Sequence, residues 1–530
     1  MAASFRSYLA DLTKGDELIE IAKPTDARDI AALVAQAEKA LLFKHVCGYS
    51  TPVVSGLLQS RNRLAIGMGV PYGKIEEKLR NAMDHPIKPE RVKRAPVKDV
   101  ILTKNEVNVF DLPVPIFSIM DGGPMITGGV VIAEDPEHGM NAGMYRLMLK
   151  ERNVTGIDIV TPNNLRRFTE RAMAKQKPLP ISISIGTHPY ECVASTFKAN
   201  LGVNELTFAG GLRGEPLQLA DGETIPVPCI AEAEIVLEGE ILPDGWIYPE
   251  GPFCEFNRLM GGIHKNPHVR IKAIMHRKEP IYYALHMPWE NIWMSAPIYE
   301  AAAWRVLHEA GVQATAVNVT PGGCCHWHIV AAIKKVPGDG KNAIMALLSI
   351  ADIKHVTIVD DDIDVFDPTD VEWAIATRVQ GDRDIMIVTN ARAKPLDPSL
   401  AQGAGVVPTG AKVGIDATIP DGIPREHYER ITYAYADSAK IDDYLKGKKD
   451  EAGEAGDDAA VKRLAADILA AIDKEPLYYT DIAERFADYD FRTVARALGH
   501  LHKTEKLWQD PRGRMCARGS KFAAVMPVKK

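Results

Sequence analysis

Two glutamates, Glu250 and Glu255, are the residues of this sequence best placed to do chemistry. They stand five positions apart in the segment Glu250-Gly-Pro-Phe-Cys-Glu255. The proline and glycine between them break helix and strand periodicity, so a loop of restricted backbone can direct both carboxyl groups toward one point. Apolar neighbours such as Phe253 and Phe256 would exclude water and raise the pKa of at least one carboxyl group, which suits a general acid. A surface turn with two solvated glutamates is an equally good interpretation of the loop by itself.

Arg146 is a second candidate, at the end of the segment Gly139-Met-Asn-Ala-Gly-Met-Tyr-Arg146. This segment predicts the edge of a strand, and a planar guanidinium there can bind a carboxylate through two parallel hydrogen bonds. By itself, an ordinary strand arginine is the simpler explanation. Polar residues also gather in residues 204–215 and 353–367.

Composition limits the class of protein. The chain has 530 residues, of which 46% are hydrophobic and 25% charged, as in ordinary globular proteins of several domains. A net charge of -7 argues against a dedicated nucleic-acid binder. No apolar run approaches the roughly 18 residues of a membrane span, and the start of the chain lacks an apolar signal core. Seven cysteines without metal-binding spacing predict free thiols in a reducing cytoplasm.

Helix and strand signals divide the chain into five parts. Residues 1–100 form an N-terminal α/β segment. Residues 101–296 contain many short Val- and Ile-rich strands between glycines and prolines, which predicts a barrel or split barrel. Residues 297–440 alternate between helix and strand, as in an α/β layer. A charged linker covers 441–458, and residues 459–530 follow the helix, helix, helix, hairpin order of a winged helix. The predicted fold class is therefore α+β and α/β, multidomain.

The C-terminal part has two interpretations. Residues 488–530 carry ten Lys and Arg against four Asp and Glu. They could bind DNA through the helix at 490–505, where Arg492, Arg496 and Lys503 would face outward. A packing or oligomerisation module that reuses a common fold is favoured, because the rest of the chain is acidic.

Six sequence blocks together resemble the UbiD family of prenylated-flavin-dependent, non-oxidative decarboxylases. The resemblance covers roughly residues 1–435, and the blocks occur in the family's order. They are Ser4-Phe-Arg-Ser-Tyr-Leu, Ala209-Gly-Gly-Leu-Arg-Gly-Glu215, Glu234-Ile-Val-Leu-Glu-Gly-Glu, Glu250-Gly-Pro-Phe-Cys-Glu255, Asp361-Asp-Ile-Asp-Val-Phe-Asp and Trp373-Ala-Ile-Ala-Thr-Arg378.

The resemblance implies a reversible decarboxylase of an aromatic or heteroaromatic carboxylic acid, with prenylated FMN in a split-barrel domain. Arg146 would hold the substrate carboxylate and pair with Glu250. Glu255 would protonate the carbon that CO2 leaves. The implied partners are the substrate, CO2, a UbiX-type flavin prenyltransferase that supplies the cofactor, and further copies of the chain in a homodimer or homohexamer.

The resemblance also implies a cofactor site with Mn2+ or Mg2+ and K+. The implied metal ligands are Asn141, Glu205 and Asn164, where Asn164 occupies the position of the family's usual histidine. An amide oxygen can still bind such a hard cation. The residues implied to contact the cofactor are Thr127, Asn141, Ala142, Gly143, Met144, Tyr145, Arg146, Asn163, Asn164, Glu205 and Lys354.

Other polar residues carry less specific signals. The resemblance implies that His286 faces the substrate, and a structural histidine is equally compatible with the residue type. His326 and His328 alternate with Trp327 and are expected in the core or at an interface. The acidic run Asp360–Asp362 is expected to be a solvated strand end.

Two alternatives remain open from the sequence. One is a winged-helix DNA-binding regulator, or a bifunctional protein, with a flavin-type ligand pocket. A pure sensor would not need the proton donor that Glu255 provides. The other is a conventional flavin oxidoreductase on a split barrel, which would require an external electron donor.

Overall fold

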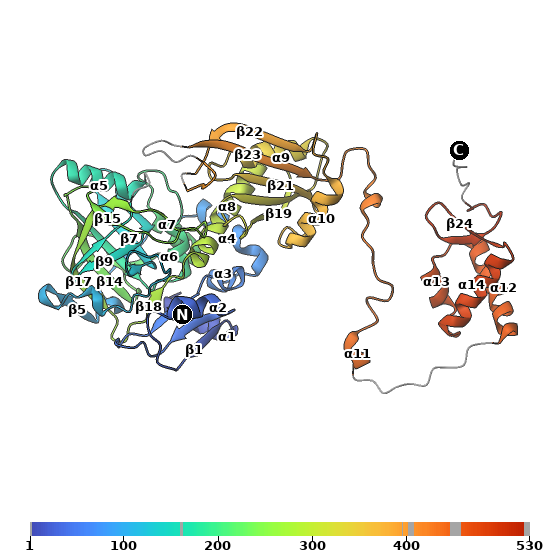
Figure 1. Ribbon diagram of the computed structural model, residues 1–530, viewed down its shortest axis with the longest axis horizontal. Helices are drawn as coiled ribbons and strands as arrows, with labels where there is room; N and C mark the ends of the chain where they lie inside the picture. Colours follow the sequence, from blue (N-terminus) through green and yellow to red (C-terminus); the bar gives the residue numbers. More distant parts are fainter. Residues whose placement is uncertain (1–2, 160–162, 395, 401–407, 446–456, 524–530) are drawn as a thin grey trace. The chain divides into compact units, whose positions relative to one another are not determined.

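The structure is a computed structural model that describes residues 3–159, 163–394, 396–400, 408–445 and 457–523. The chain forms two compact units, Met1–Ile423 and Pro424–Lys530 (Figure 1). The fold of the first unit is mixed α+β with several layers. The domain boundaries expected at 100 and 296 within it stay predictions.

The N-terminal layer is a four-stranded sheet with the order β1-β2-β3-β18. Helix α1 precedes it, and Phe5, Tyr8 and Leu12 are buried on one face of this helix because they recur at helical spacing. The Ser4 hydroxyl caps the helix by accepting a hydrogen bond from the Ser7 amide. The elements are α1 (Phe5–Lys14), β1 (Leu18–Ile21), α2 (Ile30–Gln36), β2 (Ala40–Phe43), β3 (Val53–Ser55), α3 (Arg61–Met68), α4 (Ile75–Asp84) and β18 (Tyr282–Ala284).

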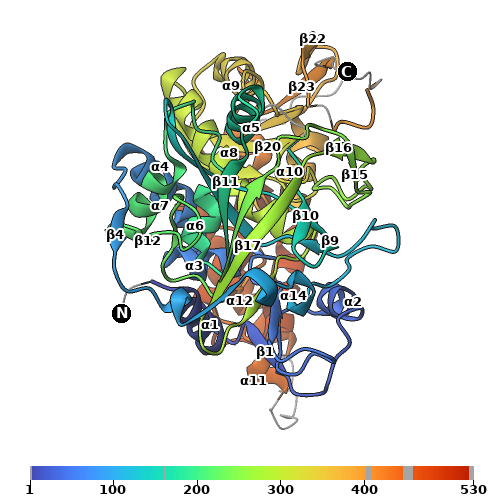
Figure 2. The same ribbon diagram turned by 90° about the vertical axis from the view of Figure 1, so that its left-hand side faces the viewer.

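A curled sheet of nine strands forms the centre of the first unit. Its order is β6-β9-β10-β17-β14-β11-β7-β8, and β5 pairs with β17; Figure 2 shows β17 crossing the layer. Strands β7, β11 and β14 are buried along almost their whole length, although β11 alternates isoleucine with serine and β14 contains the buried Glu238. The strands are β5 (Val100–Thr103), β6 (Met125–Ile126), β7 (Gly129–Asp135), β8 (Gly139–Met144), β9 (Leu147–Glu151), β10 (Val154–Gly156), β11 (Leu179–Ile185), β14 (Ile235–Ile241) and β17 (His268–His276).

Shorter elements surround the curled sheet. Helix α5 packs on β7, β8 and β11, and a hairpin of β15 and β16 carries the glutamate loop between its strands. These elements are β4 (Glu90–Val92), α5 (Asn164–Ala174), α6 (Pro189–Ala194), α7 (Glu205–Arg213), β12 (Gln218–Ala220), β13 (Cys229–Ile230), β15 (Tyr248–Glu250) and β16 (His264–Asn266).

The last layer of the first unit is a five-stranded sheet with the order β19-β20-β21-β23-β22. The long helix α8 leads into it and contacts β19. The elements are α8 (Trp289–Glu309), β19 (Ala314–Val319), β20 (His328–Ile333), α9 (Asp339–Leu348), β21 (His355–Asp360), α10 (Pro368–Arg378), β22 (Ile385–Arg392) and β23 (Thr409–Ala417). The expected solvated strand end at Asp360–Asp362 is wrong, because Asp360 is buried and both Asp360 and Asp362 pair with the buried Arg378.

In the described part of the second unit, the short helix α11 precedes three further helices and a two-stranded hairpin, and these last elements have the order that the sequence predicts for residues 459–530. Leu464, Ile468, Val494 and Leu498 lie in its core. The elements are α11 (Ile441–Leu445), α12 (Asp458–Lys474), α13 (Tyr479–Arg485), α14 (Phe491–Lys503), β24 (Leu507–Gln509) and β25 (Met515–Ala517). Most of the expected linker, residues 446–456, lies outside the described part of the chain.

Two general features concern the whole chain. Among the helices described, none combines the length and apolar character that a bilayer crossing requires. All seven cysteines are free, as the sequence predicts, and five of them are buried.

Candidate active site

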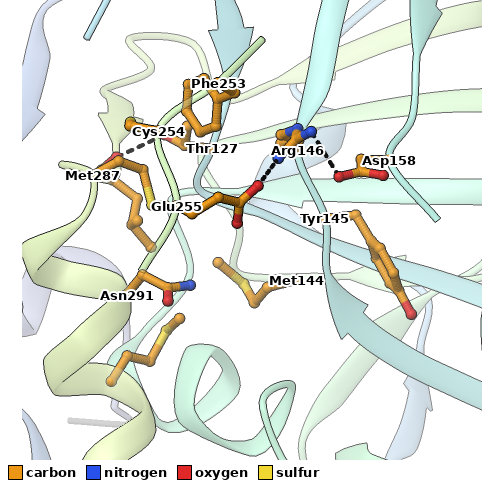
Figure 3. A pocket seen from close by; sticks show the side chains of 12 residues that line it. Thr127, Met144, Tyr145, Arg146, Asp158, Phe253, Cys254, Glu255, Met287 and Asn291 are labelled. Atoms are coloured by element: carbon orange, nitrogen blue, oxygen red, sulfur yellow. Dashed lines mark hydrogen bonds and ion pairs between the residues drawn. The ribbon is translucent and has the colours of Figure 1, made fainter. Parts of the chain in front are cut away.

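A cavity of about 190 Å3 lies between the curled sheet and the start of helix α8 (Figure 3). Two of the three predicted catalytic residues, Arg146 and Glu255, line it. The lining residues are Thr127, Met144, Tyr145, Arg146, Asp158, Phe253, Cys254, Glu255, Leu285, Met287, Asn291 and Met294.

Arg146 occupies the short connection between β8 and β9 and lies between two acids. Its Nη1 donates to Glu255 Oε1 at 2.9 Å, and its Nη2 lies 2.8 Å from Asp158 Oδ2 (Figure 3). Burial lowers the pKa of Arg146, but the charges of Asp158 and Glu255 outweigh burial and leave the pKa above its ordinary value. The guanidinium therefore stays charged, and its buried Nε has no hydrogen-bond partner among the described residues.

Asp158 is a site residue that the sequence interpretation missed. It follows β10 and accepts a hydrogen bond from the buried Asn266 amide at 3.3 Å. The available signal was an acid between two apolar residues, Ile157 and Ile159, both of which are buried. Such an isolated acid in an apolar segment needs a cationic partner, which Arg146 provides here.

Glu255 reaches the cavity from a tightly bonded loop. Its amide donates to the Leu259 carbonyl at 2.8 Å, and the Gly261 amide donates to the Phe253 carbonyl at 2.8 Å. Gly122 packs so closely on this loop that a Cβ atom there would overlap the carbonyl of Gly251. Burial raises the pKa of Glu255 above its ordinary value, although Arg146 opposes the shift. Glu255 is thus an acid that keeps its proton more readily than a solvated glutamate.

Glu250 ends strand β15 and is fully buried, but it does not line the cavity. Within the described part of the chain, neither of its carboxylate oxygens has a well-formed hydrogen bond, and burial raises its pKa to about 7. It packs against Gly156, where a Cβ atom would overlap Oε2 of Glu250. The expected pair of Arg146 with Glu250 is not what the structure shows. The β15–β16 hairpin turns Glu250 toward β10, and Arg146 bonds Glu255 and approaches Asp158 instead.

Two of the three predicted metal ligands lie together. The Asn141 amide nitrogen donates to Glu205 Oε1 at 2.7 Å, and the Ala142 amide donates to Glu205 Oε2 at 2.8 Å. Burial raises the pKa of Glu205 to about 7. The side-chain oxygen of Asn141 is buried and has no hydrogen-bond partner among the described residues. Asn164 makes no hydrogen bond with either residue among those described; its amide donates to the Ala199 carbonyl at 3.2 Å.

The other predicted cofactor contacts fall in three places. Thr127, Met144 and Tyr145 line the cavity. Gly143 lies against the Tyr145 ring, where a side chain would collide with the ring. Asn163 caps helix α5 by accepting a hydrogen bond from the Arg166 amide.

Lys354 and His286 do not line the cavity. Lys354 precedes β21 and pairs with Asp397 at 2.8 Å. His286 is buried, and burial lowers its pKa to about 4. Its ring lies 6.1 Å from Phe117, whose ring in turn lies 6.0 Å from Phe253 of the cavity wall. His286 therefore belongs to an aromatic cluster behind this wall.

Family models match three consecutive parts of the chain. Residues 9–83, 90–288 and 292–417 match the N-terminal, Rift-related and C-terminal domains of 3-octaprenyl-4-hydroxybenzoate carboxy-lyase, UbiD. Together the matches cover most of the first unit and none of the second.

Relatives and solved structures agree with these matches. An anhydromevalonate phosphate decarboxylase of Methanosarcina mazei is 36% identical over 437 residues, which cover 81% of this chain and 98% of the relative. A phenolic acid decarboxylase of Sedimentibacter hydroxybenzoicus is 30% identical over 465 residues, which cover 81% of this chain and 93% of the relative.

The UbiD-class enzyme HmfF of Pelotomaculum thermopropionicum has been solved with FMN. It is 39% identical and superimposes with a TM-score of 0.79, over 83% of this chain and 100% of that one. An evolved dimeric form of the same enzyme, solved with prFMN, is 37% identical with a TM-score of 0.76, over 84% of this chain and 100% of that one. The three domain matches, the relatives and the superposition together show that the chain belongs to the UbiD family and is a carboxy-lyase.

Proposed function

We propose that this enzyme catalyses the reversible, non-oxidative decarboxylation of an aromatic or heteroaromatic carboxylic acid, with prenylated FMN as its cofactor. The observation that carries the proposal is the bond between Arg146 and Glu255 inside one cavity, which apolar side chains such as Phe253 and Leu285 also line. A permanently charged fork suits a substrate carboxylate, and a buried acid suits a proton transfer to carbon.

The chain's own groups account for binding and for the proton. Arg146 binds the carboxylate, which takes the place of Glu255 on the guanidinium, and apolar side chains such as Phe253 and Leu285 hold the ring and exclude water. As the bond between ring carbon and carboxylate breaks, CO2 leaves and the bonding electron pair stays with the ring. Glu255 then gives its proton to that carbon, so that carboxylate and proton become arene and CO2. Prenylated FMN, when bound, supplies the electron acceptance that makes the C–C bond breakable.

The residues present fit a divalent metal beside the cofactor phosphate. Asn141 contributes a buried carbonyl oxygen without a partner, and Glu205 contributes a carboxylate, both of them hard oxygen donors. We assign Mn2+ or Mg2+ to this pair, with Asn164 as a third ligand and K+ nearby. Asn141→Ala should lower the divalent metal content of the purified protein, measured by elemental analysis. Undiminished content would remove Asn141 from the ligand set.

The direct test is isotope exchange. Protein produced together with a UbiX-type flavin prenyltransferase should exchange the ring hydrogen of its product arene for deuterium in the presence of CO2, and should release CO2 from the acid. No external electron donor should be required, which separates this function from that of a flavin oxidoreductase. An enzyme that carries prenylated FMN and is inert toward a broad panel of aryl acids would overturn the proposal.

The curled sheet corresponds, in this proposal, to a split barrel, and the second unit to a winged helix used for packing or oligomerisation. In the second unit, several basic side chains are paired with acidic side chains of the same unit. Arg496 pairs with Asp458, and Arg518 with Glu505. Such pairing reduces the positive field available to a phosphate backbone. Salt-sensitive retention of DNA by the full chain in a gel-shift experiment would contradict this assignment.

The assembly and location follow the same reasoning. We propose a location in the cytoplasm, since seven free thiols suit a reducing compartment. We also propose a homodimer or homohexamer, as the family resemblance implies. Light scattering of the full chain measures the assembly directly.

A further inference from the structure

Residues 431–445 of the second unit expose several large apolar side chains. Each of these side chains is between 45% and 87% exposed; they are Ile431, Tyr433, Tyr435, Ile441, Tyr444 and Leu445. None of them belongs to a hydrophobic cluster among the described residues. Contiguous exposed apolar side chains are typical of surfaces that contact another protein. An apolar surface is therefore expected to cover this segment.

Helix α11 carries three of these side chains at the spacing with which a helix fills a groove. Ile441, Tyr444 and Leu445 occupy positions i, i+3 and i+4, which share one helix face. Asp442 and Asp443 stand between them in the sequence, and both are exposed. A surface that receives α11 should therefore combine an apolar floor with a basic rim.

A groove of about 620 Å3 in the second unit has this combination. Residues of α12, of α14 and of the end of β25 line it, and its apolar lining includes Ala465, Ala466, Leu469 and Leu501. Of the charged side chains in the lining, Arg518 pairs with Glu505 at 2.5 Å. Lys462 and Lys506 have no ion pair among the described residues, and they outnumber the remaining acid, Asp473. The groove therefore has an excess of positive charge, which complements the acidic residues of α11.

The single chain leaves both surfaces uncovered. Among the described residues, none from 431–445 lines the groove, although the segment and the groove belong to the same unit. A second copy covers both surfaces, because a reciprocal exchange of α11 between two copies fills two grooves and buries two apolar helix faces. Residues 446–457 connect α11 to α12. A chain of that length spans up to about 40 Å, so it does not restrict α11 to its own groove.

We infer that α11 of one copy binds in the groove between α12, α14 and β25 of a second copy, which returns its own α11 to the first. The apolar face of α11 packs on the apolar lining, and its two aspartates lie toward Lys462 and Lys506. The partner for this surface is thus another copy of the same chain. The inference concerns the second unit alone and goes beyond the proposed catalytic function.

Cysteine cross-linking of the full chain tests this contact. One copy carries Tyr444→Cys on α11, and a second, differently tagged copy carries Ala466→Cys in the groove. Both positions are exposed, so neither substitution disturbs a core. After co-expression and mild oxidation, mass spectrometry should find a disulfide between these two cysteines, which only contact between copies can form.

Two further samples complete this experiment. In the control, Glu484→Cys, at an exposed position of α13 outside the groove, replaces Ala466→Cys. The control should give less cross-link by about 10-fold or more, because docking raises the effective concentration of the paired thiols. In the other sample, Tyr444→Cys and Ala466→Cys are placed together in one chain.

Charge reversal gives a second readout. Asp442→Lys and Asp443→Lys in the copy that donates α11 should lower the cross-link by about 3-fold or more, since two ion pairs are lost. Lys462→Glu and Lys506→Glu in the copy that supplies the groove should restore it. A cross-link that forms only when both cysteines share one chain would place α11 in its own groove and overturn the inference. Cross-linking no higher than in the control, or charge reversal without rescue, would also overturn it.

Discussion

Glu250 and Glu255 are close in sequence but are buried in different surroundings. The buried carboxyl group of Glu255 accepts a hydrogen bond from the charged Arg146. Glu250 instead packs against Gly156 and, among the described residues, has no well-formed hydrogen bond. The resulting pKa is raised at both residues and reaches about 7 at Glu250. Acids with distinct environments can take distinct roles. In our proposal Glu255 donates the proton, whereas Glu250 lies outside the cavity and titrates separately.

Replacement of the proton donor tests the role of Glu255. Glu255→Gln keeps a side chain of similar shape that cannot supply the proton. We expect deuterium exchange to fall by about 100-fold or more, the usual contribution of a general acid. Cofactor content, read from the absorption spectrum, should stay unchanged. Glu309→Gln, at the exposed end of α8, is the control. Exchange at the wild-type rate in Glu255→Gln would assign the proton to another group.

The buried Glu250 should make stability depend on pH. Its folded pKa of about 7 lies above its ordinary value of 4.5. The folded state therefore holds a proton that the unfolded state has lost, and ΔG of unfolding decreases as pH rises from about 4.5 to 7. The shift corresponds to about 3 kcal/mol.

Glu250→Gln removes this titration, so its stability relative to the wild type should increase between pH 5 and pH 8. Urea unfolding at both pH values measures the difference. A variant whose stability runs parallel to the wild type across this range would show that Glu250 is not the titrating group.

At the scale of elements, the glutamate loop connects two layers. Its strands β15 and β16 flank the curled sheet, but Phe256 is buried in the core of the five-stranded layer. The Lys394 ammonium lies 4.3 Å from the centre of the Phe256 ring, and the His326 ring lies 4.2 Å from it. The Asn257 amide donates to the Leu396 carbonyl at 3.0 Å. Arg146 comes from one layer, and the loop that carries its partner Glu255 is anchored in the other.

Phe256→Ala should therefore loosen the Glu255 loop. Removing a buried aromatic ring costs about 3–5 kcal/mol, and an alanine at position 256 no longer holds the adjacent Glu255 in place. We expect kcat to fall by more than KM changes, because carboxylate binding at Arg146 does not need this anchor. Phe110→Ala, where the ring is half exposed, is the control. An equal loss in both variants would contradict the anchoring role.

The sequence largely predicts which segments form helices and strands, but it does not predict which elements lie next to one another. Helix α10 and strand β21 follow from local periodicity and capping, which depend on residues close in sequence. The family resemblance implied that Arg146, Glu250 and Glu255 share one site, but it paired Arg146 with Glu250. The bond to Glu255, 109 residues away in sequence, follows from the fold. The side to which Glu250 turns depends on Gly156, and the role of Asp158 depends on Arg146. Both are long-range contacts that sequence periodicity does not encode.

At the scale of the whole molecule, the family match ends at residue 417 and the second unit begins at Pro424. Each unit has its own hydrophobic core. Units with separate cores can unfold separately. The activity that we propose belongs to the first unit, since every residue of the candidate site lies there.

Leu498→Ala, in the core of the second unit, should test this independence. We expect calorimetry of the full chain to show two unfolding transitions, and the variant to lower only one of them. The expected loss is about 2–5 kcal/mol for a buried leucine. Deuterium exchange at the candidate site should remain unchanged. A single transition, or lost exchange in a folded variant, would show that the two units are coupled.

The bond between Arg146 and Glu255 has one more consequence. A substrate carboxylate must compete with Glu255 for the same guanidinium. Once displaced, Glu255 loses the charge that lowered its pKa and gains a second anion nearby, and both changes raise its pKa further. Arrival of the acid should therefore draw a proton from the buffer. Binding heats measured in buffers of different ionisation enthalpy would reveal this uptake, so that the reactant itself loads the proton that later replaces its CO2.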